Sequence, residues 1–293
     1  MSAFGANIGH WHDVNAKTGV TAIIFDKPST ASVHVAGGAP GTQETDLLDP
    51  SCLVNSVDAI VLTGGSAFGL ASVVGVRRYL EEKGRGFDVA GVKVPIVPAA
   101  VIFDLGVGSP DKRPGPEEGY MACVNSEKSA TEDGAIGAGC GATVGKYMGS
   151  GKSSQGGLAS SILQTQSGAT ITAIMVANCF GAVVDPETGK TVAGPKDDNG
   201  AFISYLNAPP TPPRFGATSI GVVTTDIKLS KADAKRVAIM AHDGLARTVY
   251  PCHTPYDGDA IFVVSTGDRK ESVSITGAWA AKAVERAMIS AVS

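Results

Sequence analysis

Apolar residues along the chain fall into short runs, separated by stretches in which they recur at helical spacing. β-Branched and aliphatic residues dominate the short runs, and glycine, proline and aspartate bound most of them, which is typical of strands. Residues 26–29 predict a turn that joins the first two runs as a hairpin. Pro95 and Pro98 favour an edge position for the first half of the run in which they lie. The predicted strands cover residues 19–25, 31–36, 57–62, 94–104, 161–166, 170–178, 218–225 and 260–265.

Helical spacing predicts helices between these strands. Ser66 is expected to cap the first helix, and Ser230 with Asp233 resembles a capping box at the start of the third. Strands followed by helices in both halves of the chain favour two sheets packed face to face with helices outside. Periodicity alone does not distinguish that fold from a doubly wound sheet. The predicted helices cover residues 66–80, 121–128, 230–249 and 275–289.

A proline-rich stretch at residues 209–213 runs through Arg-Phe-Gly-Ala directly into the strand that begins at Thr218. Four prolines in five residues exclude helix and central strand, because proline lacks the amide donor and fixes φ. Gly216 and Ala217 are small, so little bulk shields the Ala217–Thr218 carbonyl from attack. A hydroxyl where a linker meets a strand suits an N-terminal nucleophile that cuts its own precursor by an N→O shift. The freed amine, with a pKa of about 8, would then serve as its general base. The alternative is an ordinary linker followed by an ordinary strand.

Two glycine-rich segments also bear on chemistry. Gly64 and Gly65 lie between a predicted strand and a predicted helix, where exposed amides could face a substrate carboxylate or an oxyanion. The phosphate-binding glycine motifs are incomplete there, so a tight turn needed for packing is the alternative. Residues 134–146 contain many glycines, which indicates backbone packed against backbone or ligand, and they end in the lone charge of Lys146.

Composition excludes several classes of protein. The 293 residues are 43% hydrophobic and 18% charged, with a net charge of −4 and no basic stripe, so nucleic acid is not expected as a partner. No run of 18 apolar residues and no signal-peptide pattern occurs, which predicts a soluble, cytoplasmic protein without a membrane partner. The five scattered cysteines predict free thiols. His10 and His12 lack a third ligand, and we expect no metal and no cofactor.

Several segments resemble the DmpA-like peptidases, which are N-terminal-nucleophile aminopeptidases that include β-peptidyl aminopeptidases and the nylon-oligomer hydrolase. The resemblance runs from Gly9 to beyond Gly267, nearly the whole chain. Taken together, the matching segments are highly specific. They are residues 62–70 (LTGGSAFGL), 137–146 (GAGCGATVGK), 216–223 (GATSIGVV), 241–247 (AHDGLAR) and 253–259 (HTPYDGD).

The resemblance implies an α+β, four-layer αββα sandwich that cuts itself between Ala217 and Thr218. A large subunit, 1–217, would stay bound to a small subunit, 218–293, in tetramers or larger assemblies. By the same resemblance Thr218 is the nucleophile, Asn178 an oxyanion or positioning donor, and Lys146 a charge near the nucleophile. Asp257 and Asp259 would be the carboxylates that hold the free α-amine. At i, i+2 on an extended strand they would face the same side, with a cation between them.

Some assignments have structural alternatives. The Asp-Gly-Asp segment could be a simple turn or part of a calcium loop, and Asn178 could be a buried amide with satisfied hydrogen bonds. His242 is expected to be a structural residue on a helix face, because Thr218 would bring its own base. The sequence also departs from the family twice. Ala217 replaces the commoner Asn or Gly, and Phe103 stands where several members have a substrate-site Tyr whose hydroxyl stabilises the oxyanion.

The expected function is therefore an amide hydrolase that removes N-terminal residues from short peptides or opens nylon-type ω-amino-acid oligomers. An acyltransferase of the ornithine acetyltransferase type is the first alternative, in which an amino acid intercepts the ester at Thr218. A non-catalytic binding module is the second. An intact chain on a denaturing gel would favour the binding module, and acyl transfer from N-acetylornithine would favour the transferase.

Overall fold

The computed structural model describes residues 5–126, 132–208 and 216–293. One mixed sheet of nine strands forms the centre, in the order β10-β11-β14-β16-β2-β4-β7-β3, with β1 paired to β2. Its strands are β1 (Ala6–Asp13), β2 (Thr18–Val35), β3 (Thr42–Gln43), β4 (Ser56–Thr63), β7 (Ala99–Val101), β10 (Gly157–Gln164), β11 (Thr170–Ala177), β14 (Ile220–Ile227) and β16 (Ala260–Arg269).

In the described part of the chain, short strands form three small additional sheets, and four α-helices cover the central one. The small strands are β5 (Phe87–Val89), β6 (Val92–Val94), β8 (Thr143–Val144), β9 (Ser154–Gln155), β12 (Ala182–Val184), β13 (Thr191–Ala193) and β15 (Val249–Tyr250). The helices are α1 (Ser72–Glu82), α2 (Pro116–Ser126), α3 (Lys231–Thr248) and α4 (Val273–Ser290).

Strand β2 joins the two halves of the central sheet. Its first part pairs with β1 and β4, whereas residues 30–35 pair with β16. The predicted hairpin with a turn at 26–29 is therefore wrong, because the chain stays extended there and its register with β4 shifts between Ile24 and Ser29. Each half of β2 has its own long-range antiparallel partner, so the exposed residues 26–28 stay within one continuous strand.

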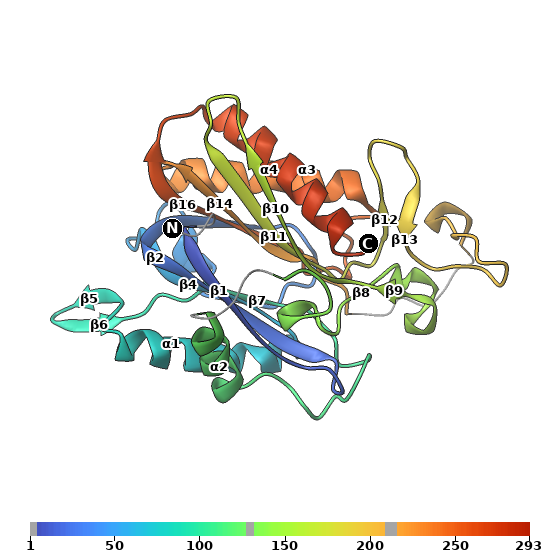
Figure 1. Ribbon diagram of the computed structural model, residues 1–293, viewed down its shortest axis with the longest axis horizontal. Coiled ribbons are helices and arrows are strands. Elements are labelled where there is room, and N and C mark those ends of the chain that lie inside the picture. Colours follow the sequence, from blue (N-terminus) through green and yellow to red (C-terminus); the bar gives the residue numbers. More distant parts are fainter. Residues whose placement is uncertain (1–4, 127–131, 209–215) are drawn as a thin grey trace.

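Most of the buried apolar residues lie in three layers, which separate the helices and the two halves of the sheet from one another. Ala173 and Met175 of β11 pack towards α3 and α4, whereas Ile174 and Val176 point the opposite way, as the period of two requires. The second layer lies between the two halves of the folded sheet, and the third lies between β2, β4 and the pair α1 and α2. Figure 1 shows α3 and α4 on one side of the strands and α1 and α2 on the other. The fold is the α+β, four-layer αββα sandwich, and the doubly wound alternative is excluded.

Most local predictions are confirmed, with corrections at the ends of elements. Ser230 and Asp233 form the capping box of α3, and α4 lies where its periodicity placed it. Ser66 does not cap a helix: it opens a 3₁₀ turn over Ser66–Ala71 whose N-cap is Gly65, and α1 begins only at Ser72. β7 is shorter than predicted, because Pro95 and Pro98 precede it outside any strand.

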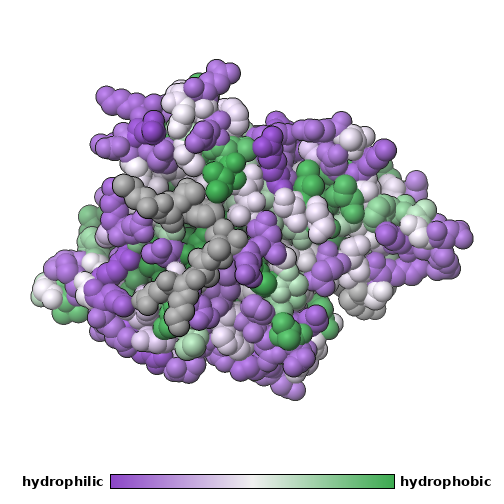
Figure 2. Space-filling model, in the orientation of Figure 1, coloured by the Kyte–Doolittle hydropathy of each residue, from purple (hydrophilic) through white to green (hydrophobic). Residues whose placement is uncertain are grey.

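Helix α2 begins five residues earlier than expected, and its predicted end lies partly outside the described residues. The proline-rich stretch 209–213 also lies outside them. Hydrophilic residues cover much of the face shown in Figure 2, with apolar patches between them. Within the described ranges, no helix is long and apolar enough to cross a membrane.

Candidate active site

Three strand ends bring the predicted site residues together. β11 runs antiparallel to β14, with Val176 opposite Ile220, and β14 runs parallel to β16, with Ile220 opposite Ala260. The C-terminal end of β11 and the N-terminal ends of β14 and β16 therefore meet at one edge of the sheet. Asn178 follows β11, Thr218 precedes β14, and residues 257–259 precede β16.

Thr218 is buried, at 6% exposure, and its surroundings fix the Ala217–Thr218 peptide bond. The Thr218 amide donates to the Asn178 carbonyl at 2.8 Å, and the Thr218 hydroxyl donates to the Ala217 carbonyl oxygen. The same carbonyl oxygen accepts from the Gly258 amide at 3.0 Å. A Cβ on Gly258 would lie 2.9 Å from the Thr218 Oγ1, so glycine leaves room for that hydroxyl. The nucleophile candidate and the carbonyl that it would attack are thus held in contact.

Lys146 supplies a positive charge beside this bond. It begins a 3₁₀ turn, Lys146–Met148, after Gly145. Its Nζ donates to the Gly216 carbonyl at 2.7 Å, the Asn178 Oδ1 at 2.7 Å and the Asn178 carbonyl at 3.1 Å. Desolvation lowers the pKa of Lys146 from 10.5 to about 8, and the carboxylates of Asp257 and Asp104 oppose that shift. The expected charge therefore contacts the carbonyl of Gly216, which lies two residues before Thr218 in the chain.

Asn178 is fully buried, and its side chain contacts the lysine more closely than the nucleophile. Its Oδ1 accepts from Lys146 and from the Thr143 amide at 3.0 Å, and its Nδ2 donates to the Phe103 carbonyl at 3.4 Å. Its main-chain carbonyl is the acceptor for Thr218. These contacts favour a positioning role for Asn178 in the continuous chain.

Asp257 and Asp259 are each 1% exposed, and they hold different parts of the site. Asp257 accepts from the Phe180 amide at 3.0 Å and from the Thr254 amide and hydroxyl. Burial and the neighbouring charge of Asp259 raise the pKa of Asp257 from 3.8 to about 6, against the effect of those hydrogen bonds. Asp259 accepts from the Ser219 amide at 2.6 Å. The Thr218 nitrogen, which the aspartates were expected to hold as a free amine, donates in the continuous chain to the Asn178 carbonyl.

The predicted substrate-binding residues fall into two groups. Phe103, 38% exposed, lies against Gly216, where a Cβ would come within 2.5 Å of its ring, and Gly216 has φ +112°. Phe103 is therefore next to the segment in which cleavage is predicted. The amides of Gly64 and Gly65 donate to the Gly19 carbonyl and to the Asp104 Oδ1, both within the protein. That finding supports a tight turn there, with its amides already engaged.

Three further residues lie around the candidate site and were not predicted from the sequence. Asp104 is buried, accepts from Thr18 and Gly65, and has a pKa raised by burial. The Gly258 amide is a donor to the Ala217 carbonyl, for which the glycine between two aspartates was the available signal. His253 has Nδ1 at 2.7 Å from the Asp259 Oδ2 and an unusual φ of +53°. It lies in the same segment as the two aspartates.

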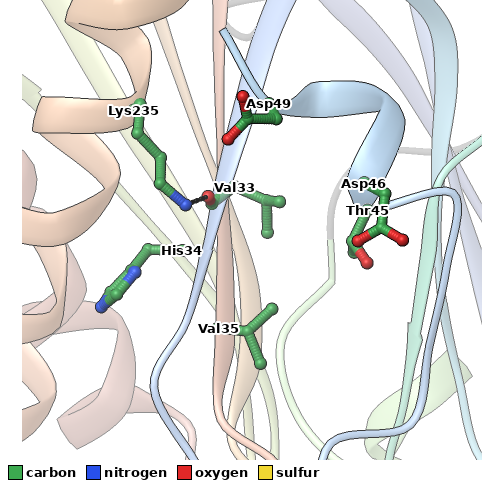
Figure 3. A pocket seen from close by; sticks show the side chains of 7 residues that line it. All are labelled: Val33, His34, Val35, Thr45, Asp46, Asp49 and Lys235. Carbon is green, nitrogen blue, oxygen red and sulfur yellow. Dashed lines mark hydrogen bonds between the residues drawn. The ribbon is translucent and has the colours of Figure 1, made fainter. Parts of the chain in front are cut away.

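His242 is structural, as expected. Its Nε2 donates to the His34 carbonyl at 2.9 Å, and burial lowers its pKa to about 4. Its ring lies edge-on to those of His34 and His253, with centroids 5.1 and 4.8 Å apart. His34 in turn lines a cavity of about 360 Å³ beside β2 (Figure 3), where Lys235 donates to the Val33 carbonyl at 2.6 Å. This cavity contains none of the predicted site residues.

The cysteines are free thiols, as expected. Among the described residues, Cys252, His253 and Asp259 form the one group of three potential metal ligands. His10 and His12 are not part of it, and His10 instead contacts the Thr21 hydroxyl at 3.0 Å.

The αββα layers place a hydroxyl residue at the start of a strand, with a lysine and two buried aspartates around it. The layers themselves are those of the N-terminal-nucleophile hydrolase fold. Peptidase family S58 matches residues 4–293. The chain belongs to that family and is a hydrolase that acts on peptide or amide bonds.

Relatives and solved structures agree with this assignment. An uncharacterised aminopeptidase of Mycobacterium leprae is 40% identical over 290 residues, which cover 90% of this chain and 77% of the relative. A 6-aminohexanoate-oligomer endohydrolase of a Kocuria species is 26% identical over 278 residues, with 90% and 74% covered. The L-aminopeptidase D-Ala-esterase/amidase of Ochrobactrum anthropi superimposes with a TM-score of 0.74 at 17% identity, over 98% of this chain and 83% of that one. At that identity the structural match shows the fold alone.

Proposed function

We propose that the chain cuts itself between Ala217 and Thr218 and then hydrolyses amides with Thr218 as an N-terminal nucleophile. The observation that carries the proposal is the contact between the Thr218 hydroxyl and the Ala217 carbonyl, whose oxygen the Gly258 amide holds at 3.0 Å. In self-cleavage, Oγ1 attacks the Ala217 carbonyl carbon, the acyl group passes from nitrogen to oxygen, and water hydrolyses the ester. The products are a chain of residues 1–217 and a chain of residues 218–293.

The new α-amine then makes turnover possible. With a pKa of about 8, it accepts the proton of its own hydroxyl while Oγ1 attacks the substrate carbonyl. The amine product leaves, and water hydrolyses the acyl ester at Thr218. Asp257 and Asp259 would hold the amine after cleavage frees it from its hydrogen bond to Asn178. Lys146 and Asn178 would position the nucleophile and stabilise negative charge, together with the Gly258 amide.

Short peptides and ω-amino-acid oligomers are the proposed substrates. The relatives named as aminopeptidase and as 6-aminohexanoate-oligomer endohydrolase support this range. Phe103 lies beside Gly216 but carries no hydroxyl, so Lys146, Asn178 and backbone amides would have to stabilise the oxyanion without it. We further propose that the processed protein works in the cytoplasm as a homotetramer or a larger assembly. The family assignment favours hydrolysis over acyl transfer and over a binding module.

Thr218→Ala and Thr218→Ser test the proposal together. The alanine variant should remain one chain of 293 residues with native-like circular dichroism, and the serine variant should still be cut. A Thr218→Ala protein that is cut at the same bond would show that another group performs the cleavage. Active Thr218→Ala protein would remove Thr218 from catalysis.

A further inference from the structure

Three side chains with metal-binding atoms converge beside Thr218. The Cys252 Sγ, a ring nitrogen of His253 and a carboxylate oxygen of Asp259 lie within 4.8 Å of one another. The Asp259 Oδ2 is 2.7 Å from the His253 Nδ1 and 3.9 Å from the Cys252 Sγ. A tetrahedral zinc ion with bonds of about 2.3 Å to sulfur and about 2.0 Å to nitrogen and oxygen holds such atoms about 3.2–3.5 Å apart. Side-chain shifts of about 1 Å would therefore complete three bonds of such a site.

The surroundings leave these ligand atoms available. Asp259 uses Oδ1 to accept from the Ser219 amide, so Oδ2 can bind a cation without breaking that contact. Cys252 and His253 are partly exposed, so the group lies near the protein surface. Thiolate, imidazole and carboxylate together suit a borderline-soft cation such as Zn²⁺, rather than Mg²⁺ or Ca²⁺.

Two buried nitrogens beside the cluster give an independent indication. The His242 Nε2 faces a carbonyl and so carries the ring hydrogen, which makes the Nδ1 of the neutral ring an acceptor. His253 donates from Nδ1 to Asp259, which makes its Nε2 an acceptor as well. Neither the His242 Nδ1 nor the His253 Nε2 has a hydrogen-bond partner among the described residues, although the two rings are adjacent. These two ring nitrogens are thus both acceptors, and neither carries a hydrogen that it could donate to the other.

A cation on the His253 Nδ1 would resolve this conflict. It would displace the Nδ1 proton and leave the ring hydrogen on Nε2, beside the acceptor on His242. Histidine ligands ordinarily donate their second nitrogen to such a partner, which fixes the tautomer. A second proton on His253 would satisfy the same two nitrogens and is the competing explanation.

We propose that Cys252, His253 and Asp259 form an inhibitory site for Zn²⁺ or a similar cation. Binding releases the thiol proton and the Nδ1 proton and involves no change of oxidation state. The inhibitory part rests on the proposed function, because the bound cation would occupy Asp259 and repel the α-ammonium of Thr218. Binding itself does not depend on that function.

Cobalt titration of the purified, metal-free protein tests the binding site. Co²⁺ bound to a thiolate gives a near-ultraviolet charge-transfer band, which Zn²⁺ removes by displacement. We expect a band with one-to-one stoichiometry in the wild type and in the control variant Cys52→Ser, whose cysteine is exposed and far along the chain. Cys252→Ser should lack the band. No band in the wild type, or an equal band in Cys252→Ser, overturns the site and leaves a second proton on His253 as the explanation.

Inhibition of aminoacyl p-nitroanilide hydrolysis tests the role. Zn²⁺ should inhibit the wild type, and the inhibition constant, measured against each protein's own metal-free rate, should be at least about 10-fold weaker in Cys252→Ser. Equal inhibition of both proteins overturns the inhibitory role of this site. A protein that shows the cobalt band but hydrolyses nothing would contradict the proposed function and leave the site standing.

Discussion

Replacing Lys146 by methionine should change the free energy of unfolding of this protein only a little but abolish its self-cleavage. Burial lowers the pKa of Lys146 from 10.5 to about 8, which at 1.36 kcal/mol per unit amounts to a penalty of about 3 kcal/mol at pH 7. Methionine removes that penalty but also removes the three hydrogen bonds of Nζ, including the one to the Gly216 carbonyl. An unsatisfied buried acceptor costs about 1–3 kcal/mol. The two effects act in opposite directions, so the free energy of unfolding of the variant should stay within about 2 kcal/mol of that of its parent at pH 7.

The dependence on pH gives the sharper result. Below pH 8 the lysine is protonated in both the folded and the unfolded chain, so the penalty is fully present. Between pH 8 and 10.5 the folded chain loses the proton while the unfolded chain keeps it, and the penalty declines. The lysine-containing protein should therefore gain about 2.5 kcal/mol over Lys146→Met between pH 7 and pH 10.

Urea denaturation in a Thr218→Ala background, which should keep the chain continuous, measures this difference. Lys152→Met is the matched control for removal of a lysine from an exposed position, because the Lys152 side chain is 47% exposed. A stability difference for Lys146→Met that is constant from pH 7 to pH 10 would refute the buried cation. With Thr218 present, Lys146→Met should stay uncut, since the Gly216 carbonyl and Asn178 lose their positive partner.

The remaining predictions concern the residues around Thr218. Asn178→Ala should lower kcat by about 100-fold, as loss of a single oxyanion donor does, and an unchanged kcat in correctly processed protein would remove Asn178 from the site. Asp257 should impose an acidic limit on kcat/KM near pH 6, because its carboxylate is needed and its pKa is raised to about 6. That same shift favours the protonated form in the folded chain, so stability through this group should rise, not fall, from pH 6 to pH 4. Asp257→Asn and Asp259→Asn should both reduce processing and hydrolysis with melting temperatures within a few degrees, and loss of stability with turnover intact would mark a structural turn.

Local chemistry explains which parts of the fold could be predicted from the sequence. Ser230 and Asp233 cap α3 because both halves of a capping box lie within one turn. The apolar run at residues 170–178 predicted a strand, and the structure then shows its neighbouring side chains entering different layers. The continuous strand across Pro28 could not be predicted, because its partners β1, β4 and β16 are set by the tertiary fold.

The candidate site also has features that the local sequence could suggest and others that depend on the tertiary fold. Thr218 and Ala217 could be proposed from the sequence as a cleavage site, because a hydroxyl at a linker–strand junction has a local signature and a family match. The donors and acceptors around them could not. Gly258 reaches the Ala217 carbonyl through its backbone amide, which no side-chain pattern reveals. The His253 contact with Asp259 depends on how the segment before β16 turns, including a positive φ at His253.

Intact mass and N-terminal sequencing of the purified wild-type protein test the central claim most directly. The account predicts two chains, of 217 and 76 residues, that copurify, with the smaller chain beginning Thr-Ser-Ile-Gly at Thr218. Thr218→Ala, prepared in parallel, should give one mass for the full chain. A single uncut chain in wild-type protein that hydrolyses amides, or a new terminus anywhere but Thr218, would contradict the account.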